Sequence, residues 1–175
     1  MKNYTEDLQL PTTRYAPGWG THLPILAKVL MASTGPVMEL GIGVFSTPFL
    51  HNYCAAQNRF LDSYESDKGW VGLHKYFVTP IHRITCVTDW DTIPIEKNRW
   101  GVIFVDHESS RRAKEAIRAS QYADYVIIHD SNGRLNPIYH WDFVYPYFKY
   151  QYVFNKFFPH TTVLSNFYRV DNLWI

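Results

Sequence analysis

Two uninterrupted apolar runs constrain the fold more than any other feature of this sequence. Residues 100–106 (WGVIFVD) and 123–129 (ADYVIIH) are apolar at most positions and rich in β-branched side chains. A strand that is apolar on both faces must be covered on both faces, which is typical of a parallel sheet packed between helices. Shorter apolar runs at 36–43, 59–65 and 83–87 fit three further strands of the same sheet.

Helices are expected between these strands, because apolar residues recur there at a spacing of three or four. Thr21 and Ser46 stand where a hydroxyl side chain could cap such a helix. The alternation of strand and helix predicts one doubly wound α/β domain over residues 1–175, with residues 1–34 as a lead-in and first helix. The expected helices cover residues 21–31, 46–57, 67–77 and 109–122.

Aromatic residues crowd the C-terminal part of the chain, between residues 138 and 158. We expect a helix over 141–147 and an antiparallel hairpin of strands 150–154 and 161–167 at the sheet edge. The aromatic side chains could fill the core under this hairpin, form the face of a homodimer, or line a pocket for a flat acceptor molecule. The hairpin brings the predicted sheet to seven strands, most of them parallel.

Composition excludes several other classes of protein. The chain is 46% hydrophobic and 19% charged, which is typical of a globular domain, and its formal net charge of +1 argues against a large nucleic-acid surface. Cys54 and Cys86 are expected to be buried free thiols, since they form no paired motif. The N-terminal residues lack the apolar core of a signal peptide, and no stretch approaches the ~18 apolar residues of a membrane span. A cytoplasmic location is the expectation that follows.

A glycine turn follows the first expected strand, within residues 38–47 (MELGIGVFST). Gly41 and Gly43 would let a ligand approach the backbone, and the helix that opens near Ser46 would present free N–H groups to it. The third glycine of a dinucleotide-binding fingerprint is absent, and Ser46 stands in its place. A plain tight turn is the alternative.

An acid closes the second expected strand, in residues 64–70 (YESDKGW). Glu65 is the best-placed residue to accept hydrogen bonds from both hydroxyls of a ribose. Asp62 and Asp67 are alternatives if the strand boundary lies elsewhere, and an acid that only caps a surface helix is a further alternative.

Taken in order, ELGIG, the acid after the second strand, TDWD after the third and FVDH after the fourth resemble a class I S-adenosylmethionine-dependent methyltransferase. The acid followed shortly by a tryptophan resembles the small-molecule branch of that family. The resemblance covers roughly residues 35–131. It implies a Rossmann-like fold with an antiparallel edge hairpin, S-adenosylmethionine as cofactor, and methyl transfer to an acceptor that the sequence does not name.

The resemblance also implies roles for individual residues. Glu39 would help to hold the methionine amino group, while Gly41, Gly43 and Ser46 would lie along the methionine portion, and Glu65 would take the ribose.

Further along the chain, Asp89 would meet the adenine amino group and Trp90 would flank the ring. Asp106 would face the methionine amine or the acceptor.

Methyl transfer from a sulfonium calls for alignment of the acceptor and in some cases a general base. His107 and His129 follow the fourth and fifth strands, at the edge where such sheets bind ligands, and with Asp106 they are the candidate catalytic residues. For each histidine the alternative is a structural hydrogen bond to the backbone.

Four residues are candidates for contact with the acceptor: Tyr15, His22, Arg111 and Asp130. Arg111 could clamp an acidic group, although a solvated helix face is the alternative. No metal is expected, because catechol-type methyltransferases place Asn directly after the second acid, whereas Asn132 lies two residues beyond Asp130.

A small-molecule acceptor is therefore the expected partner, with nucleic acid disfavoured and no membrane contact. Two other functions stay open: a non-catalytic domain that binds S-adenosylmethionine or a partner protein, and a nicotinamide-dependent oxidoreductase.

Overall fold

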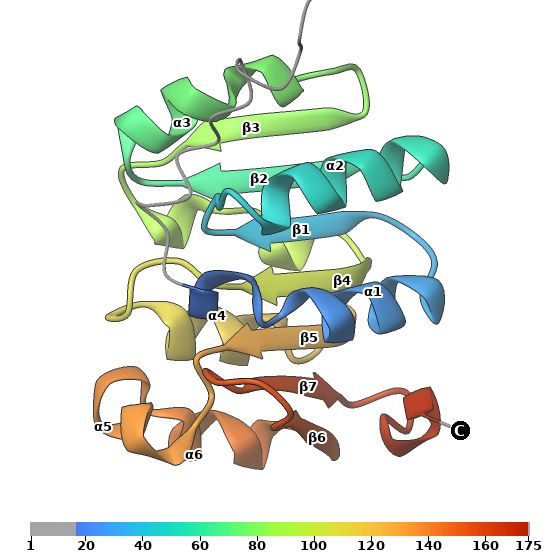
Figure 1. The fold of residues 1–175 in the computed structure, drawn as a ribbon, viewed down its shortest axis with the longest axis vertical. Coiled ribbons are helices and arrows are strands. Elements are labelled where there is room, and N and C mark those ends of the chain that lie inside the picture. Colours follow the sequence, from blue (N-terminus) through green and yellow to red (C-terminus); the bar gives the residue numbers. More distant parts are fainter. Residues whose placement is uncertain (1–16, 175) are drawn as a thin grey trace, which may run out of the picture.

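One sheet, with the strand order β3-β2-β1-β4-β5-β7-β6, runs through the part of the chain that this computed structural model describes, residues 17–174 (Figure 1). Strands β1 to β5 are mutually parallel, whereas β7 runs antiparallel to both β5 and β6. The strands are β1 (Val37–Leu40), β2 (Leu61–Glu65), β3 (His82–Cys86), β4 (Trp100–Val105), β5 (Ala123–His129), β6 (Tyr150–Phe154) and β7 (Thr161–Ser165).

The strand order reverses between β1 and β4, which are hydrogen-bonded neighbours although two strands separate them in the sequence. In an open parallel sheet, the crevice for a ligand lies beyond the carboxyl ends of the strands at such a switch point. The topology therefore directs attention to the residues that follow β1 and β4.

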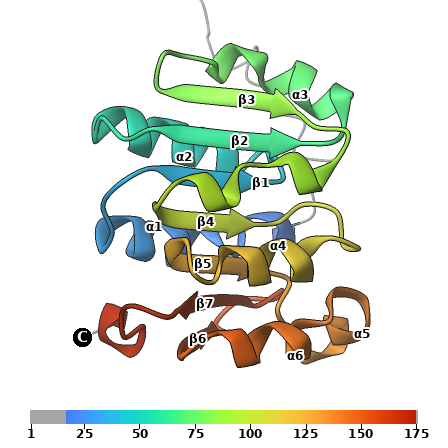
Figure 2. The same ribbon diagram turned by 180° about the vertical axis from the view of Figure 1, so that it is seen from behind.

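Helices cover both faces of the sheet (Figures 1 and 2). The apolar side chains of α1 and α2 pack on one face, while those of α4 and α6 pack on the other. Every residue of β1 and β4 is buried, including Glu39 in β1. The helices are α1 (Leu23–Met31), α2 (Ser46–Ala56), α3 (Lys68–His74), α4 (Arg112–Ala119), α5 (Asn136–Tyr139) and α6 (Trp141–Val144).

The predicted fold class is confirmed: the sheet is Rossmann-like, mostly parallel, and ends in an antiparallel hairpin. The predicted ranges 123–129 and 150–154 coincide with β5 and β6. The helix expected over 141–147 is instead α6 followed by the 3₁₀ turn η6 (Tyr145–Tyr147). Pro146 explains this, because a proline has no N–H to donate within a helix.

Three local expectations were wrong. Thr21 does not cap α1, whose N-cap residue is His22, and Phe45 takes the N-cap position of α2 that was expected for Ser46. Cys54 is buried but Cys86 is exposed, because it ends the edge strand β3. Among residues 17–174 no helix has the length and the apolar character needed to cross a membrane.

Candidate functional site

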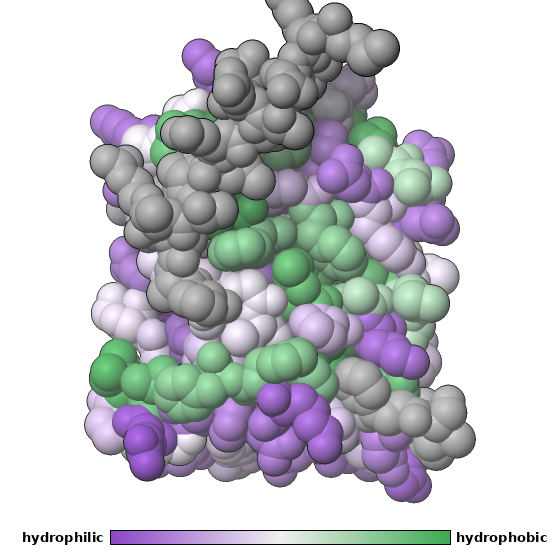
Figure 3. Space-filling model, viewed as in Figure 1, coloured by the Kyte–Doolittle hydropathy of each residue, from purple (hydrophilic) through white to green (hydrophobic). Residues whose placement is uncertain are grey.

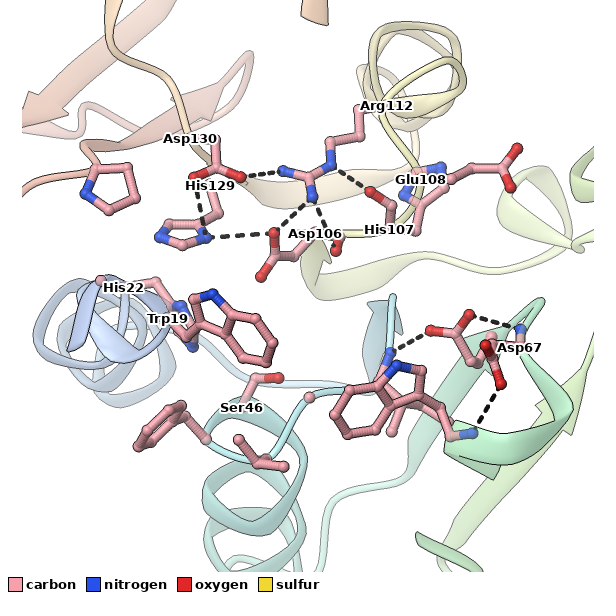
Figure 4. Close-up of a pocket in the computed structure, with 18 of the residues that line it drawn as sticks. Trp19, His22, Ser46, Asp67, Asp106, His107, Glu108, Arg112, His129 and Asp130 are labelled. Atoms are coloured by element: carbon pink, nitrogen blue, oxygen red, sulfur yellow. Dashed lines mark hydrogen bonds and ion pairs between the residues drawn. The ribbon is translucent and has the colours of Figure 1, made fainter. Parts of the chain in front are cut away.

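A cavity of about 770 Å³ lies at the switch point, beyond the carboxyl ends of β1, β2, β4 and β5 (Figure 4). Its size is within the range of small-molecule sites. The loop before β7 and the segment before α1 also contribute residues to its lining. Its lining includes residues 42–46, 65–67, 106–108, 129–130 and 158–159, together with Gly18, Trp19, His22, Trp70, Arg112 and Leu135.

The glycine turn after β1 forms part of the cavity wall. Gly41 has φ +95, and a Cβ atom there would lie 2.5 Å from the carbonyl oxygen of Asp106. The absence of a side chain at Gly41 therefore lets the turn after β1 pack against the backbone after β4. Gly43 does line the cavity, and its N–H donates to Thr47 Oγ1 over 3.0 Å. Ser46 lines the cavity as the first residue of α2.

Glu65 ends β2, and its carboxylate accepts hydrogen bonds from three backbone N–H groups at the wall of the cavity. Its Oε2 accepts from the N–H of Ile42 over 3.1 Å, and its Oε1 accepts from the N–H groups of Ser66 and Asp67 over 2.7 and 2.9 Å. The carboxylate is thereby held in place, and Oε2 has a lone pair left for a further donor.

Asp67 and Trp70 stand beside Glu65 in the wall. The Asp67 carboxylate caps α3 by accepting from the N–H groups of Gly69 and Trp70 over 2.6 and 3.0 Å. The candidate site residues did not include Trp70, although its position after an acid was the signal quoted for the small-molecule branch.

Asp89 and Trp90 do not line the cavity. Asp89 is exposed and caps the 3₁₀ turn η3 (Trp90–Thr92) by accepting from the N–H of Asp91 over 2.9 Å. The Trp90 side chain is 4% exposed and lies in the core, where its ring centroid is 4.2 Å from that of His107. The turn after β3 therefore directs this tryptophan beneath the cavity.

Arg112, not Arg111, enters the cavity wall. Its guanidinium donates from Nη1 to Asp130 Oδ2 over 2.8 Å, and its Nη2 lies 3.0 Å from Asp106 Oδ1. Its Nε donates to the carbonyl of His107. Arg111 instead pairs with Asp91 and with the buried carboxylate of Glu115. Arg112 thus ties the end of β4 to the end of β5.

His129 stands between Asp106 and Thr21. Its Nδ1 is 3.3 Å from Asp106 Oδ1, and its Nε2 is 3.0 Å from the Thr21 hydroxyl. Burial by itself would lower the pKa of His129, but the Asp106 carboxylate outweighs burial, so the pKa is raised. Burial would likewise raise the pKa of Asp106, yet His129 and Arg112 lower it to about 2.

His22 and Asp130, two further candidates for contact with the acceptor, also lie at this end of the cavity. His22 is 1% exposed, and its ring centroid lies 4.8 Å from that of His129. Burial lowers the pKa of His22 to about 4. Asp130 has φ +58, a left-handed conformation that aspartate tolerates better than most residues, and its carboxylate bonds Arg112. Tyr15 lies outside the described residues.

The His107 side chain is fully buried and does not face the cavity. Its Nε2 lies 3.5 Å from Glu115 Oε2, and Trp90 covers the ring. Burial lowers the pKa of His107. His107 therefore contributes its backbone to the wall, since its carbonyl accepts from Arg112.

Glu39 lies below the glycine turn and is fully buried. Its carboxylate accepts from the hydroxyls of Thr47 and Ser63 over 2.9 and 2.6 Å. Burial raises the pKa of Glu39 to about 7, against the effect of these bonds. Ser63 Oγ also lies 3.0 Å from His82 Nε2, and His82 Nδ1 lies 3.0 Å from His51 Nδ1. A chain of polar groups thus connects Glu39 to the half-buried His51 on α2.

The C-terminal aromatic residues divide among several surroundings. Trp141, Phe148 and Phe154 are buried in the core, and Phe158 lines the cavity. Others are exposed, Phe143 by 65%. Figure 3, in the same view as Figure 1, shows a band of apolar surface over the C-terminal segments.

No family model matches the sequence, and no curated protein matches it either. Solved structures match the fold. A precorrin-6y C5,15-methyltransferase from Geobacter metallireducens GS-15 has a TM-score of 0.58 at 11% identity, covering 86% of this chain and 92% of its own. The METTL16 methyltransferase domain has a TM-score of 0.59 at 10% identity, covering 90% and 72%. A spermidine synthase has a TM-score of 0.57 at 13% identity, covering 79% and 55%.

The chain therefore has the fold of the class I S-adenosylmethionine-dependent methyltransferases. At these identities the likeness defines the fold alone, and the spermidine synthase shares it. The function has to be argued from the residues of the cavity.

Proposed function

We propose that the protein binds S-adenosylmethionine in this cavity and directs its methyl group to a small-molecule acceptor. One observation carries the proposal: the Glu65 carboxylate, at the carboxyl end of β2, accepts a hydrogen bond from the glycine turn after β1. This places an ionisable acceptor group beside an open backbone turn at the switch point, where nucleotide ligands bind in such sheets. The cofactor supplies an electrophilic methyl group on a sulfonium, so the protein's task is alignment.

The residues of the cavity fit such a ligand. Glu65 Oε2 can accept from a ribose hydroxyl, because only the Ile42 N–H donates to it among the described residues. Trp70 offers an aromatic face for adenine in place of Trp90. Gly43 and Ser46, at the start of α2, line the wall where the methionine portion would run.

The acceptor end of the cavity is polar. Asp106, His129 and Asp130 from the strand ends face His22 from the segment before α1. These groups can orient a hydroxyl or an amine by hydrogen bonds, which makes His129 and Asp106 the proposed catalytic residues.

Nucleic acid is a poor candidate for the acceptor. The arginines of α4 are held in ion pairs: Arg112 with Asp106 and Asp130, and Arg118 with Glu96. A basic surface that is neutralised in this way offers little attraction to phosphates.

Isothermal titration with S-adenosylmethionine, S-adenosylhomocysteine and NAD tests the proposal. Both adenosyl compounds should bind, and Glu65→Ala should lose affinity by on the order of 2–4 kcal/mol if two charge-assisted hydrogen bonds are removed. Glu65→Gln keeps the side-chain shape and should lose part of that energy. Asp89→Ala is the matched control and should bind normally, because Asp89 does not line the cavity.

Three outcomes would count against the proposal in different ways. Binding of NAD alone would favour an oxidoreductase. No binding of any of the three would remove the cofactor assignment. In the third outcome, S-adenosylmethionine binds tightly while no S-adenosylhomocysteine forms with any hydroxyl or amine acceptor of a broad panel. That result would favour a domain that binds the cofactor without catalysis.

A further inference from the structure

Three potential metal ligands from three separate elements meet at the floor of the cavity. His22 precedes α1, Asp106 follows β4 and His129 ends β5 (Figure 4). One ligand atom from each lies within 4.8 Å of the others. These residues are far apart in the sequence, so the fold brings them together.

The His22 imidazole lacks partners in the described part of the chain. The side chain is 1% exposed, and neither Nδ1 nor Nε2 makes a hydrogen bond there. The rings of Phe104 and His129 pack on it, each with a centroid distance of 4.8 Å. Buried polar groups in folded proteins are nearly always satisfied, so this ring calls for a partner that these residues do not supply.

The hydrogen bonds of Thr21 orient His129. The Thr21 hydroxyl has one hydrogen, and the carbonyl oxygens of Gly18 and Pro159 lie 3.0 and 2.9 Å away as acceptors. The hydroxyl oxygen can then accept from His129 Nε2–H over 3.0 Å. This arrangement leaves Nδ1 directed at Asp106. Histidines that bind metals are typically anchored in this way, with one nitrogen donating to the protein and the other facing the ion.

Asp106 supplies both charge and a free oxygen. Its contacts with His129 and Arg112 all go through Oδ1 or the backbone carbonyl, which leaves Oδ2 without a partner among the described residues. Asp106 and Asp130 carry two negative charges against the single positive charge of Arg112. A metal ion at this place would displace the proton that His129 Nδ1 shares with Asp106, and the ligands that remain would carry a net negative charge that favours the cation.

We propose that His22, Asp106 and His129 bind a divalent transition-metal ion at the floor of the cavity. Two imidazoles and one carboxylate suit Zn²⁺, Fe²⁺ or Co²⁺, whereas Mg²⁺ prefers oxygen ligands alone. Bonds of about 2.0–2.2 Å would place the ligand atoms roughly 3–3.5 Å apart. The three side chains would therefore have to draw in by an ångström or two from the separation of up to 4.8 Å.

This ligand set differs from that of the catechol-type methyltransferases, which the sequence does not match, because Asn132 is not one of the proposed ligands. Three protein ligands leave coordination positions open towards the cavity. An acceptor hydroxyl bound there would lose its proton more readily, which is what a methyl acceptor needs. This use of the ion rests on the proposed function, whereas the binding of the ion does not.

Cobalt binding to the untagged full chain, stripped of metal with a chelator, tests the site. We expect one Co²⁺ per chain, with visible absorption bands of a low-coordinate nitrogen and oxygen site, competed by Zn²⁺ and not by Mg²⁺. His22→Phe keeps the ring volume, removes both nitrogens and should abolish the bands. His140→Asn is the matched control, because His140 is exposed with φ +56, a conformation that Asn also adopts.

Absence of cobalt bands in the wild type, or equal binding by His22→Phe, would overturn the proposal. If His22→Phe loses its near-ultraviolet circular dichroism, Asp106→Asn replaces it as the diagnostic variant. That change keeps the shape of the side chain and should weaken cobalt binding by about tenfold or more.

Titration of S-adenosylmethionine into stripped and cobalt-loaded protein keeps the two proposals apart. Binding of the cofactor without any binding of cobalt would refute the metal site and leave the proposed function standing. Binding of cobalt without the cofactor would do the reverse.

Discussion

Replacing Glu39 with glutamine should change the pH dependence of stability in a way that can be worked out from its surroundings. The carboxylate is fully buried and accepts from the hydroxyls of Thr47 and Ser63. Burial raises the pKa of Glu39 from its ordinary 4.5 to about 7, because hydrogen bonds with neutral hydroxyls compensate only partly for the loss of water.

The free energy follows from linkage. A carboxyl whose pKa is raised on folding contributes its full stability below pH 4.5, and that stability is lost as the pH rises through about 7. A pKa difference of this size corresponds to about 3 kcal/mol. Glutamine cannot ionise, so the Glu39→Gln variant escapes this loss. It pays about 1 kcal/mol instead, because its amide N–H₂ faces a hydroxyl that has to turn around.

The stability curves of the two proteins should therefore cross. At pH 4 the Glu39→Gln variant should be about 1 kcal/mol less stable than the wild type, and at pH 8.5 about 2 kcal/mol more stable. Urea unfolding followed by tryptophan fluorescence at several pH values measures this difference. The control is Glu108→Gln at an exposed position, which should show no such crossing. A wild-type-to-variant difference that stays constant from pH 4 to 8.5 would refute the reasoning.

Three further predictions concern packing, charge and assembly. Gly41→Ala should lower the free energy of unfolding by on the order of 3 kcal/mol, seen as a lower Tm, because φ is +95 and the added methyl would meet the Asp106 carbonyl at 2.5 Å. Arg112→Met should cost a similar amount, measured by urea unfolding at pH 7, since Asp106 and Asp130 would lose their shared counter-charge. If either variant is as stable as the wild type, the prediction for that variant is wrong. Light scattering should detect a homodimer that Phe143→Ser weakens, and a monomeric wild type would exclude it.

The sheet was predictable because its signal is local. A run such as residues 123–129 has only one way to bury both faces, and β5 has those bounds. The position of Glu65 followed from the same logic, because the ends of parallel strands share one edge of the sheet. The same reasoning does not predict the conformation of the loops and helix starts that follow the strands.

The errors at the site lie in such segments. Successive residues of a helix point about 100° apart, so a shift in the start of α4 decides whether Arg111 or Arg112 faces the strands. The turn after β3 sends Trp90 into the core and leaves Asp89 exposed, which no periodic pattern reports. The meeting of His22 with His129 is a long-range contact with no trace in spacing.

The hydrogen-bonded chain below the glycine turn has a direction. Ser63 has one hydrogen and donates it to Glu39, so its oxygen accepts from His82 Nε2–H, and His82 Nδ1 in turn accepts from His51. Burial lowers the pKa of His82 to about 4, so its ring is neutral and can pass a proton in at one nitrogen while it gives one up at the other. When Glu39 takes up a proton, every link reverses. The buried carboxyl can thus exchange protons with the half-buried His51 by a relay, without any opening of the fold.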